Sequence, residues 1–282
     1  MSTNIIRAII NLVNTPVVEL KEYADSHNRV NSMGGALEEY IKDIFAGTVG
    51  EIDEKKRLLK IQECFSYLGN QNNPPDSMLW GGDAIEVKKI ESKDAQLALN
   101  SSYPKAKLFS NSKMIKKACR ACEDWTVKDM IYTVGVVKDS KLSSLCMVYG
   151  IDYAADAETY EQIKEVIKDG VESINGVEFA ETKELGRVNR VDPLGITYLR
   201  VRGMWGIENP FKVFNYVYER DSSKNFNFMA LINNEKYDTL EYTDELEKLV
   251  GVKEGLELKE VNIKNPNNPA NLRKAKLITF TI

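Results

Sequence analysis

The chain has 282 residues, of which 43% are hydrophobic and 28% are charged, and its formal net charge is −4. This composition is typical of a soluble globular protein with a substantial core, and no apolar run approaches the roughly eighteen residues of a membrane span. The first residues lack the basic segment, apolar core and cleavage site of a signal peptide, so we expect a cytoplasmic protein.

The N-terminal part of the chain is predicted to be helical. Apolar residues recur at helical spacing in the opening segment and in "GGALEEYIKDIFAGT" at 34–48, namely Ile5, Ile9 and Leu12, then Leu37, Ile41, Ile44 and Phe45. Glu38 and Lys42 are four residues apart on the flank of the second helix and can form an ion pair. A further helix is predicted at 54–65.

Two short strands are predicted next, at 76–79 and 84–90. The turn "WGGD" between them contains a Gly-Gly pair, which favours a β-hairpin. The segment "NSSYPKAKLFS" at 100–110 is predicted to be a basic loop, and 112–125 is predicted to be a helix.

Strands and helices are mixed in the rest of the chain. Residues rich in β-branched and aromatic side chains predict strands at 129–137, 142–150, 196–205, 214–220, 226–232 and 276–282. An amphipathic helix with an acidic first turn is predicted at 156–174. The fold class is therefore α/β (α+β), with a mixed central sheet flanked by helices. No linker long enough to separate two domains is present, so we expect a single domain over 1–282.

The cysteine and histidine residues restrict the chemistry. Cys119 and Cys122 form a C-x-x-C, but no second pair completes a zinc site, so we interpret them as reduced helix cysteines. Cys64 and Cys146 lie in apolar segments and are predicted to belong to the core. The single histidine, His27, lies in a polar segment and is predicted to be an exposed loop residue. Any hydrolytic chemistry must therefore rest on carboxylates and lysine.

The predicted hairpin carries the side chains of a hydrolytic site. Alternation along a strand places Glu86 and Lys88 on one face and turns Val87 into the core, while Asp76 begins the neighbouring strand within reach of Glu86. Two carboxylates and a backbone carbonyl can hold Mg²⁺, which polarises a phosphoryl oxygen and lowers the pKa of a bound water. Lys88 would orient or help to deprotonate that water and offset charge on phosphorus. The competing interpretation is a surface hairpin with a Glu–Lys ladder.

The net charge conceals an uneven distribution. Residues 86–120 contain nine Lys or Arg against three Asp or Glu, whereas residues 151–182 contain nine acidic residues against two lysines. Such charge runs are most often solvated faces. Beside a catalytic hairpin, however, a basic face suits a polyanion.

Asp76, Glu86 and Lys88 match the motif of the PD-(D/E)XK nuclease superfamily residue for residue. Longer segments resemble the NgoPII family of type II restriction endonucleases: "MGGALEEYIKDIFAG", "FSYLGNQNNPPD", "GDAIEVKKIESKDAQLALNSS", "ETKELGRVNRVDPLGITYLRVRGMWGIENPFK" and "NPNNPANLRKAKLITF". The resemblance covers nearly the whole chain. It implies a PD-(D/E)XK nuclease-like fold and Mg²⁺-dependent cleavage of double-stranded DNA at the palindrome GGCC, with a cognate DNA methyltransferase that protects host DNA.

The resemblance also suggests how the molecule is organised. A palindromic site has two-fold symmetry, which favours a homodimer. We expect residues 1–180 to supply mainly the helical N-terminus and the catalytic core, and residues 181–282 to contribute DNA recognition. Two alternatives are a repair or recombination nuclease of the same superfamily, structure-specific or non-specific, and a DNA-binding protein with a non-catalytic hairpin.

A further metal ligand is expected from the helix before the hairpin. Related nucleases often add a glutamate in a pattern like G-x-x-L-E-x-x-I, which selects Glu38 here and leaves Glu39 as a solvated neighbour. A surface pair between Glu38 and Lys42 is the alternative, and the choice between the two acids stays open. Asp83 follows Gly-Gly and is better explained as a turn residue than as a ligand.

DNA contacts are expected from two segments. The residues predicted to bind bases are Arg187, Asn189, Arg190, Arg200 and Arg202, with Trp205 nearby. Arginine's planar fork matches the O6 and N7 acceptors of guanine in the major groove. Arg200 and Arg202 share one face of a strand, whereas Arg187 and Arg190 flank Asn189 in an expected loop. Alternatively, these arginines contact phosphates or pair with Glu184 and Asp192. The residues predicted to bind phosphates are Lys89, Ser101, Ser102, Lys105 and Lys107.

Overall fold

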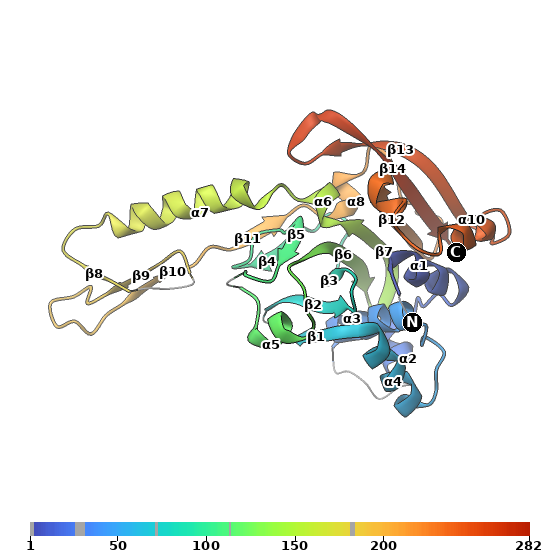
Figure 1. Ribbon diagram of the computed structural model, residues 1–282, viewed down its shortest axis with the longest axis horizontal. Helices are drawn as coiled ribbons and strands as arrows, with labels where there is room; N and C mark the ends of the chain where they lie inside the picture. Colours follow the sequence, from blue (N-terminus) through green and yellow to red (C-terminus); the bar gives the residue numbers. More distant parts are fainter. Residues whose placement is uncertain (1–2, 26–31, 71–72, 113, 181–183) are drawn as a thin grey trace.

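A nine-stranded mixed sheet forms the centre of the molecule (Figure 1). The computed structural model describes residues 3–25, 32–70, 73–112, 114–180 and 184–282. Eight strands follow the order β1-β2-β3-β6-β7-β12-β14-β13, and β5 pairs with β6 at the side. Their bounds are β1 Phe65–Asn70, β2 Asn73–Leu79, β3 Ala84–Ile90, β5 Lys107–Phe109, β6 Val127–Lys138, β7 Lys141–Tyr149, β12 Asn227–Asn233, β13 Leu256–Asn265 and β14 Asn268–Thr281. β3 runs parallel to β6 and β7 parallel to β12.

Helices cover both faces of this sheet, as expected for the fold class (Figure 1). One face is covered by α1 Ile5–Asn14, α2 Leu20–Asp25, α3 Met33–Ala46, α4 Glu54–Cys64, α9 Asn234–Tyr237 and α10 Thr243–Leu249. The other face carries α5 Lys117–Ala121, α6 Gly150–Tyr153 and α8 Pro210–Val213. None of the helices in the described residues has both the length and the apolarity that a membrane crossing demands.

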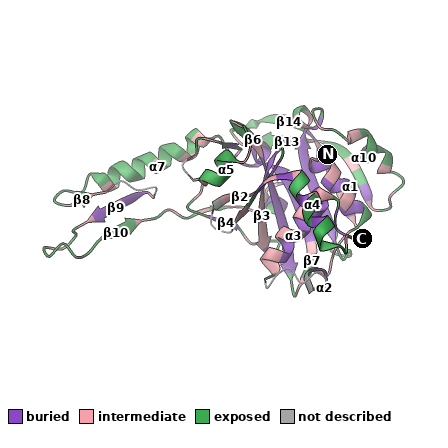
Figure 2. Ribbon diagram, turned by 60° about the horizontal axis from the view of Figure 1, so that its bottom comes forward, coloured by how far each residue is buried: buried purple, intermediate pink, exposed green. Residues whose placement is uncertain are grey.

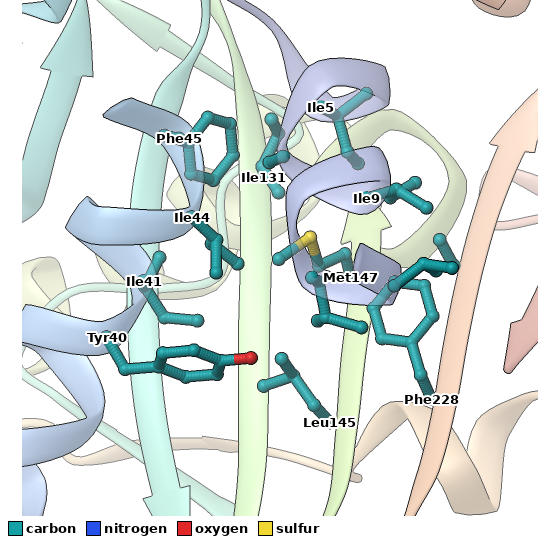
Figure 3. Packing of buried hydrophobic residues seen from close by; sticks show 14 of the residues in the cluster. Ile5, Ile9, Tyr40, Ile41, Ile44, Phe45, Ile131, Leu145, Met147 and Phe228 are labelled. Atoms are coloured by element: carbon teal, nitrogen blue, oxygen red, sulfur yellow. The ribbon is translucent and has the colours of Figure 1, made fainter. Parts of the chain in front are cut away.

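The predicted apolar faces of the first and third helices form the larger core (Figure 3). Ile5, Ile9 and Leu12 of α1 are fully buried, and so are Leu37 and Ile44 of α3. They pack against β6, β7 and β12. Burial of each such side chain contributes about 1.5–3 kcal/mol. The same cluster includes Ile85 and Val87 of β3, so this packing also holds the strand that carries the site described below.

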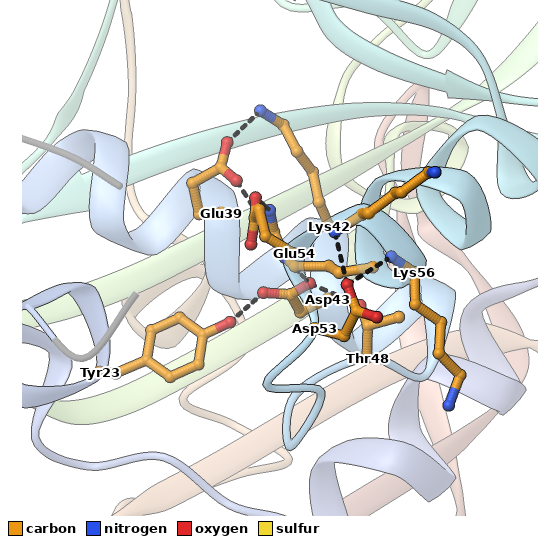
Figure 4. A network of polar contacts seen from close by, with 10 residues as sticks. Tyr23, Glu39, Lys42, Asp43, Thr48, Asp53, Glu54 and Lys56 are labelled. Atoms are coloured by element: carbon orange, nitrogen blue, oxygen red, sulfur yellow. Dashed lines mark hydrogen bonds and ion pairs between the residues drawn. The ribbon is translucent and has the colours of Figure 1, made fainter. Parts of the chain in front are cut away.

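A buried charge network ties α3 to α4 (Figure 4). Arg57 of α4 is 2% exposed; its Nε donates to Asp43 at 2.6 Å and its Nη2 to Glu39 at 2.6 Å. Asp43 also accepts hydrogen bonds from Thr48 at 2.5 Å and from the Tyr23 hydroxyl. Because burying an ion is costly, each charge here depends on its partners.

A long arm, described over residues 157–180 and 184–204, projects from the sheet (Figures 1 and 2). It contains α7 Ala157–Glu172 and a three-stranded sheet of β8 Glu178–Phe179, β9 Gly186–Asn189 and β10 Leu199–Val201. The chain returns through β11 Trp205–Ile207, which pairs with β4 Leu97–Asn100. At its base, the Tyr160 ring stacks on Tyr103 with centroids 5.2 Å apart and meets Trp205 edge-on at 5.6 Å. These three rings join the arm to the core.

The structure corrects two predicted strands. The segment 214–220 is not a strand: Phe214 and Tyr218 are buried four residues apart, because turns continue from α8 and carry both rings to the same side. The strand predicted at 196–205 divides into β10 and β11, which belong to different sheets. In addition, the strands β1, β4, β5, β8, β9 and β13 were not predicted. Of these, β5 lies within the segment 100–110 that was predicted to be a loop, and the helix predicted at 112–125 is confined to α5.

Candidate active site

The turn of the β2–β3 hairpin is held by contacts to β6 and to the segment before it. Gly81 has φ +61°, a conformation that glycine adopts without strain. Lys128 of β6 donates to the carbonyl oxygens of Leu79 at 3.0 Å and Gly82 at 2.7 Å. The carboxylate of Glu123 accepts from the Gly81 amide at 2.8 Å. The predicted hairpin is thus confirmed and rigidly seated.

Asp83 closes this turn and has a structural role. It is 6% exposed and accepts hydrogen bonds from the Tyr149 hydroxyl at 2.7 Å and from Lys236 Nζ at 2.9 Å. These bonds connect the hairpin to β7 and α9. The carboxylate is therefore already satisfied by protein groups, in agreement with its interpretation as a turn residue.

The hairpin brings Asp76, Glu86 and Lys88 together on one face of the sheet. The antiparallel register of β2 and β3 pairs Ser77 with Ile85, so Asp76 and Glu86 are the next residues along the two strands. Oδ2 of Asp76 accepts from the Val87 amide at 2.7 Å, and Lys88 Nζ lies 2.5 Å from Oε1 of Glu86. Val87 is 8% exposed and joins the core on the opposite face, as strand alternation predicts.

The site concentrates charge in a poorly solvated place. Burial and then the charge of Asp76 raise the pKa of Glu86 to about 7, although Lys88 and Lys105 act in the opposite direction. Burial also raises the pKa of Asp76, with Lys88 opposing the shift. Burial alone would lower the pKa of Lys88, but Glu86 and Asp76 outweigh it and raise that pKa. Lys88 therefore stays an ammonium ion between two carboxylates that repel each other.

The carboxylates fit a hard divalent cation. Oε2 of Glu86 is buried and lacks a hydrogen-bond partner among the described residues. A buried carboxylate oxygen without a partner is unusual, and this one is open to coordination by a metal ion. Within the part of the chain that the structure describes, no three His, Cys, Asp or Glu side chains gather closely enough to hold a metal alone. A Mg²⁺ ion suits two carboxylates because it retains waters and binds substrate phosphate oxygens.

The structure separates the two candidate acids of α3. Glu39 is engaged in the charge network, 2.7 Å from Lys42 and 2.6 Å from Arg57. For Glu38, burial and then the charge of Asp76 raise the pKa of the carboxyl group, so this carboxyl group lies within electrostatic range of Asp76. Lys42 thus pairs with Glu39, whereas the alternative interpretation had it pair with Glu38. Glu38 as a further metal ligand stays a prediction.

A cavity of about 1000 Å³ opens over Asp76, Glu86 and Lys88. Asp76, Glu86 and Lys88 line it together with Ser101, Ser102 and Lys105, with three residues that the sequence had not singled out, Lys116, Lys117 and Arg120, and with Glu184, which had been considered only as a partner of the arginines. The excess of positive charge in 86–120 was the signal for the three basic residues among them. Their convergence required the tertiary structure, because α5 lies more than twenty residues after the hairpin.

The predicted phosphate-binding lysines lie in different environments. Lys105 is 7% exposed, its Nζ lies 4.3 Å from the centre of the Tyr103 ring, and burial lowers its pKa to about 8. Lys107 is more exposed and lies 3.7 Å from Asp129. Lys89 lies on the opposite face of β3 from Lys88, in a second cavity, and pairs with Glu91 at 2.9 Å. Their contacts with DNA stay predictions.

The cysteines agree with a reduced protein. All four are free thiols. Cys119 and Cys146 are buried, whereas Cys64 is half-buried at the edge of the larger core. Cys122 Sγ donates to the carbonyl oxygen of Cys119 at 3.1 Å. His27 lies outside the described residues.

The predicted base-binding residues lie on the β9–β10 ribbon, residues 186–202 of the arm, in which Arg202 directly follows β10. Arg187 and Asn189 are strand residues of β9, not loop residues as expected, and Arg187 is paired in register with Arg200. Alternation therefore puts Arg187, Asn189, Arg200 and Arg202 on one face. Arg190 follows the strand with φ +49°, and its Nε lies 3.4 Å from Glu178.

Each of these arginines has a partner within the arm. Arg187 Nε donates to Asn189 Oδ1 at 3.1 Å. Arg200 and Arg202 both bind Glu184, at 2.7 Å and 2.6 Å. Asp192, the other acid considered as a partner, instead accepts hydrogen bonds from backbone amides of its own loop. Base readout by these arginines stays a prediction.

Comparison with known proteins identifies the family. The sequence model of the NgoPII restriction endonuclease family matches residues 3–264. The type II restriction enzyme NgoPII of Neisseria gonorrhoeae is 59% identical over 279 residues, which cover 98% of this chain and 99% of that enzyme. No solved structure matches the chain. The mixed sheet, the Asp76–Glu86–Lys88 hairpin and these matches agree: the chain belongs to the NgoPII family of type II restriction endonucleases.

Proposed function

We propose that this restriction endonuclease hydrolyses phosphodiester bonds in both strands of double-stranded DNA at GGCC, with Mg²⁺ as its cofactor. The observation that supports it best is the cluster of Asp76, Glu86 and Lys88 on the floor of a cavity with a basic wall. A phosphodiester backbone is a polyanion, and this cavity presents positive charge around two carboxylates that can hold a cation. GGCC is supported by the family resemblance.

Asp76 and Glu86 would hold the metal ion, with Glu38 as a further acid nearby. When bound, the ion polarises a phosphoryl oxygen and lowers the pKa of a bound water. Lys88 is held as an ammonium ion beside Glu86, so its protons are directed at the same space. It can orient the attacking water and stabilise negative charge that develops on the phosphate.

The basic wall would position the DNA backbone. Lys105, Ser101 and Ser102 line the cavity from one side, and Lys116 and Lys117 line it from α5. Lysine is a strong point charge for phosphate, whereas the serine hydroxyls supply hydrogen bonds. Lys89 and Lys107 are the outer candidates for backbone contacts. Arg187, Asn189, Arg190, Arg200 and Arg202 are the candidates for base contacts.

The assembly and cellular setting complete the proposal. Two strands of a palindrome must be cut, so we propose a homodimer with an isologous interface. We further propose that 1–282 is one domain in which 181–282 contributes recognition, that the protein acts in the cytoplasm, and that a cognate methyltransferase protects the same site. Static light scattering with a GGCC duplex tests the dimer: one protomer per duplex during double-strand cleavage would contradict it.

A gel assay tests the proposed activity. Phage DNA is incubated with the protein and Mg²⁺, and the mapped bands should end at GGCC. A smear would indicate a non-specific nuclease, and intact DNA would indicate a binding protein. Glu86→Ala from the same preparation is the control for contaminating nucleases. Omission of Mg²⁺ should abolish cleavage, whereas full activity in a chelator would exclude the metal.

A further inference from the structure

Glu184 occupies an unusual place between the two functional regions. It lines the catalytic cavity, yet it also forms ion pairs with the β9–β10 ribbon. Its side chain is 16% exposed, whereas those of Arg200 and Arg202 are 47% and 56% exposed. The acid is therefore the sheltered member of the cluster, and the two guanidinium groups extend from it towards solvent.

The hydrogen bonds use only part of each guanidinium group. Arg200 donates from Nε at 2.9 Å and from Nη2 at 2.7 Å, so one side of its fork binds the carboxylate. Arg202 donates from Nε alone, at 2.6 Å. Across the described residues, no other hydrogen bond engages Nη1 of Arg200 or either Nη of Arg202. The outer ends of both forks remain open to a ligand.

This is the arrangement that guanine recognition requires. A guanine presents O6 and N7 in the major groove, and an arginine reads them with two parallel N–H groups. A guanidinium group on a flexible stem must first be immobilised, and a carboxylate on its inner side does this before DNA arrives. The major groove also admits a two-stranded β-ribbon. The arginine-bearing face of the ribbon has the residues and the shape for this groove.

We propose that Glu184 is a positioning residue for sequence recognition, which directs the outer forks of Arg200 and Arg202 to guanines in the major groove. This inference rests on the proposed function, since it concerns how the same enzyme selects its site. It also assigns the Glu184 ion pairs a role: they prepare the arginines for bases. The alternative is that Glu184 masks the arginines and competes with DNA.

Guanine analogues test this proposal. Each guanine of a GGCC duplex is replaced in turn by 7-deazaguanine, which lacks the N7 acceptor, and kcat/KM is measured for cleavage. For wild type, at least one replacement should lower kcat/KM on the order of ten- to a hundredfold. In Glu184→Ala this loss of kcat/KM on base replacement, the analogue penalty, should shrink to about twofold or less, because kcat/KM for the normal duplex has already fallen. Glu184→Asp, which keeps the charge on a shorter stem, should restore part of the penalty.

The control is Glu172→Gln, which removes one negative charge from the same arm, at a residue that pairs with Lys168. It should keep the wild-type penalty. An unchanged penalty in Glu184→Ala overturns the proposal, and so does tighter binding of Glu184→Ala to every duplex, since that result indicates masking. If wild type cuts no DNA at all, the proposed function fails first. If wild type cuts and the penalties do not change, only the role of Glu184 fails.

Discussion

The core around the nine-stranded sheet and the arm are built in opposite ways. In the core, α1, α3 and the central strands bury nearly all of their apolar side chains, whereas no residue of α7 is buried (Figure 2). Among the described residues, ten of the twenty-one exposed large apolar side chains lie in the arm. The arm has a small core of its own, where Val188 is 3% exposed and Leu185 is 8% exposed. Its stability should therefore be far lower than that of the sheet.

This difference matches two demands of the proposed reaction. Phosphoryl chemistry requires groups that are fixed before substrate binds, and a hairpin inside a packed sheet provides this. Reading a duplex requires an element that can adapt to a groove, and a weakly packed arm can be ordered by its ligand. The three rings at the base of the arm connect the two regions, and one of them, Tyr103, lines the cavity.

The largest effect is expected from the catalytic hairpin. Asp76→Ala, Glu86→Ala and Lys88→Ala should each lower the rate of DNA cleavage by about three orders of magnitude or more, because each removes transition-state stabilisation. Specific binding, measured with Ca²⁺ in place of Mg²⁺, should be retained because the arm is unchanged. A Glu86→Ala enzyme that cuts at the normal rate would remove this hairpin from the mechanism.

The arrangement of the site could be predicted from the sequence because its three residues lie close together in the chain, on one hairpin. Strand alternation and a Gly-Gly turn suffice to place Asp76, Glu86 and Lys88 together, and the predicted span 84–90 coincides with β3. In contrast, β13 escaped prediction because its edge position leaves half of its side chains exposed, so that charged residues interrupt the apolar pattern. The choice between Glu38 and Glu39 depended on Arg57, which comes from another helix. Glu184 entered only as a competing partner because its place in the cavity depends on the path of the arm.

The second prediction separates the stability of the core from that of the arm. Arg57→Met leaves Asp43 buried without its cation and should lower the free energy of unfolding by about 3–5 kcal/mol. Val188→Ala should instead accelerate proteolysis within the arm and leave the urea midpoint of the core unchanged. Urea unfolding followed by circular dichroism and limited proteolysis measure the two effects. Equal shifts of the urea midpoint would mean that core and arm unfold as one unit.

The third prediction concerns pH. The pKa of Glu86 is about 7 in the folded protein and about 4.3 in an unfolded chain, so the folded state prefers the protonated acid. The protonated Glu86 side chain therefore stabilises the folded state relative to its ionised form. This contribution is fully present below pH ~4.3 and is lost as pH rises through 7. In metal-free buffer, the free energy of unfolding of wild type should therefore fall by up to about 3 kcal/mol, relative to that of Glu86→Gln, as pH rises from ~4.3 to ~7.

Metal addition provides the control for this comparison. Mg²⁺ favours ionised carboxylates, so it should restore the stability of wild type at high pH more than that of Glu86→Gln. Thermal unfolding at several pH values, with and without Mg²⁺, gives both results. Parallel pH profiles for the two proteins would contradict the raised pKa of Glu86.

The smallest effect is expected from the basic wall of the cavity. Lys117 is exposed at the start of α5 and lines the cavity, so it is placed to contact a phosphate without reading bases. Lys117→Ala should weaken binding to all DNA sequences alike, by about 1 kcal/mol. It should also reduce the slope of the logarithm of the binding constant against the logarithm of salt concentration by about one. Lys89→Ala is the informative comparison, because Lys89 lies on the opposite face of β3. A smaller loss for Lys89→Ala would confine DNA to the cavity side of the sheet, whereas equal losses would show that the duplex reaches around the edge of the core.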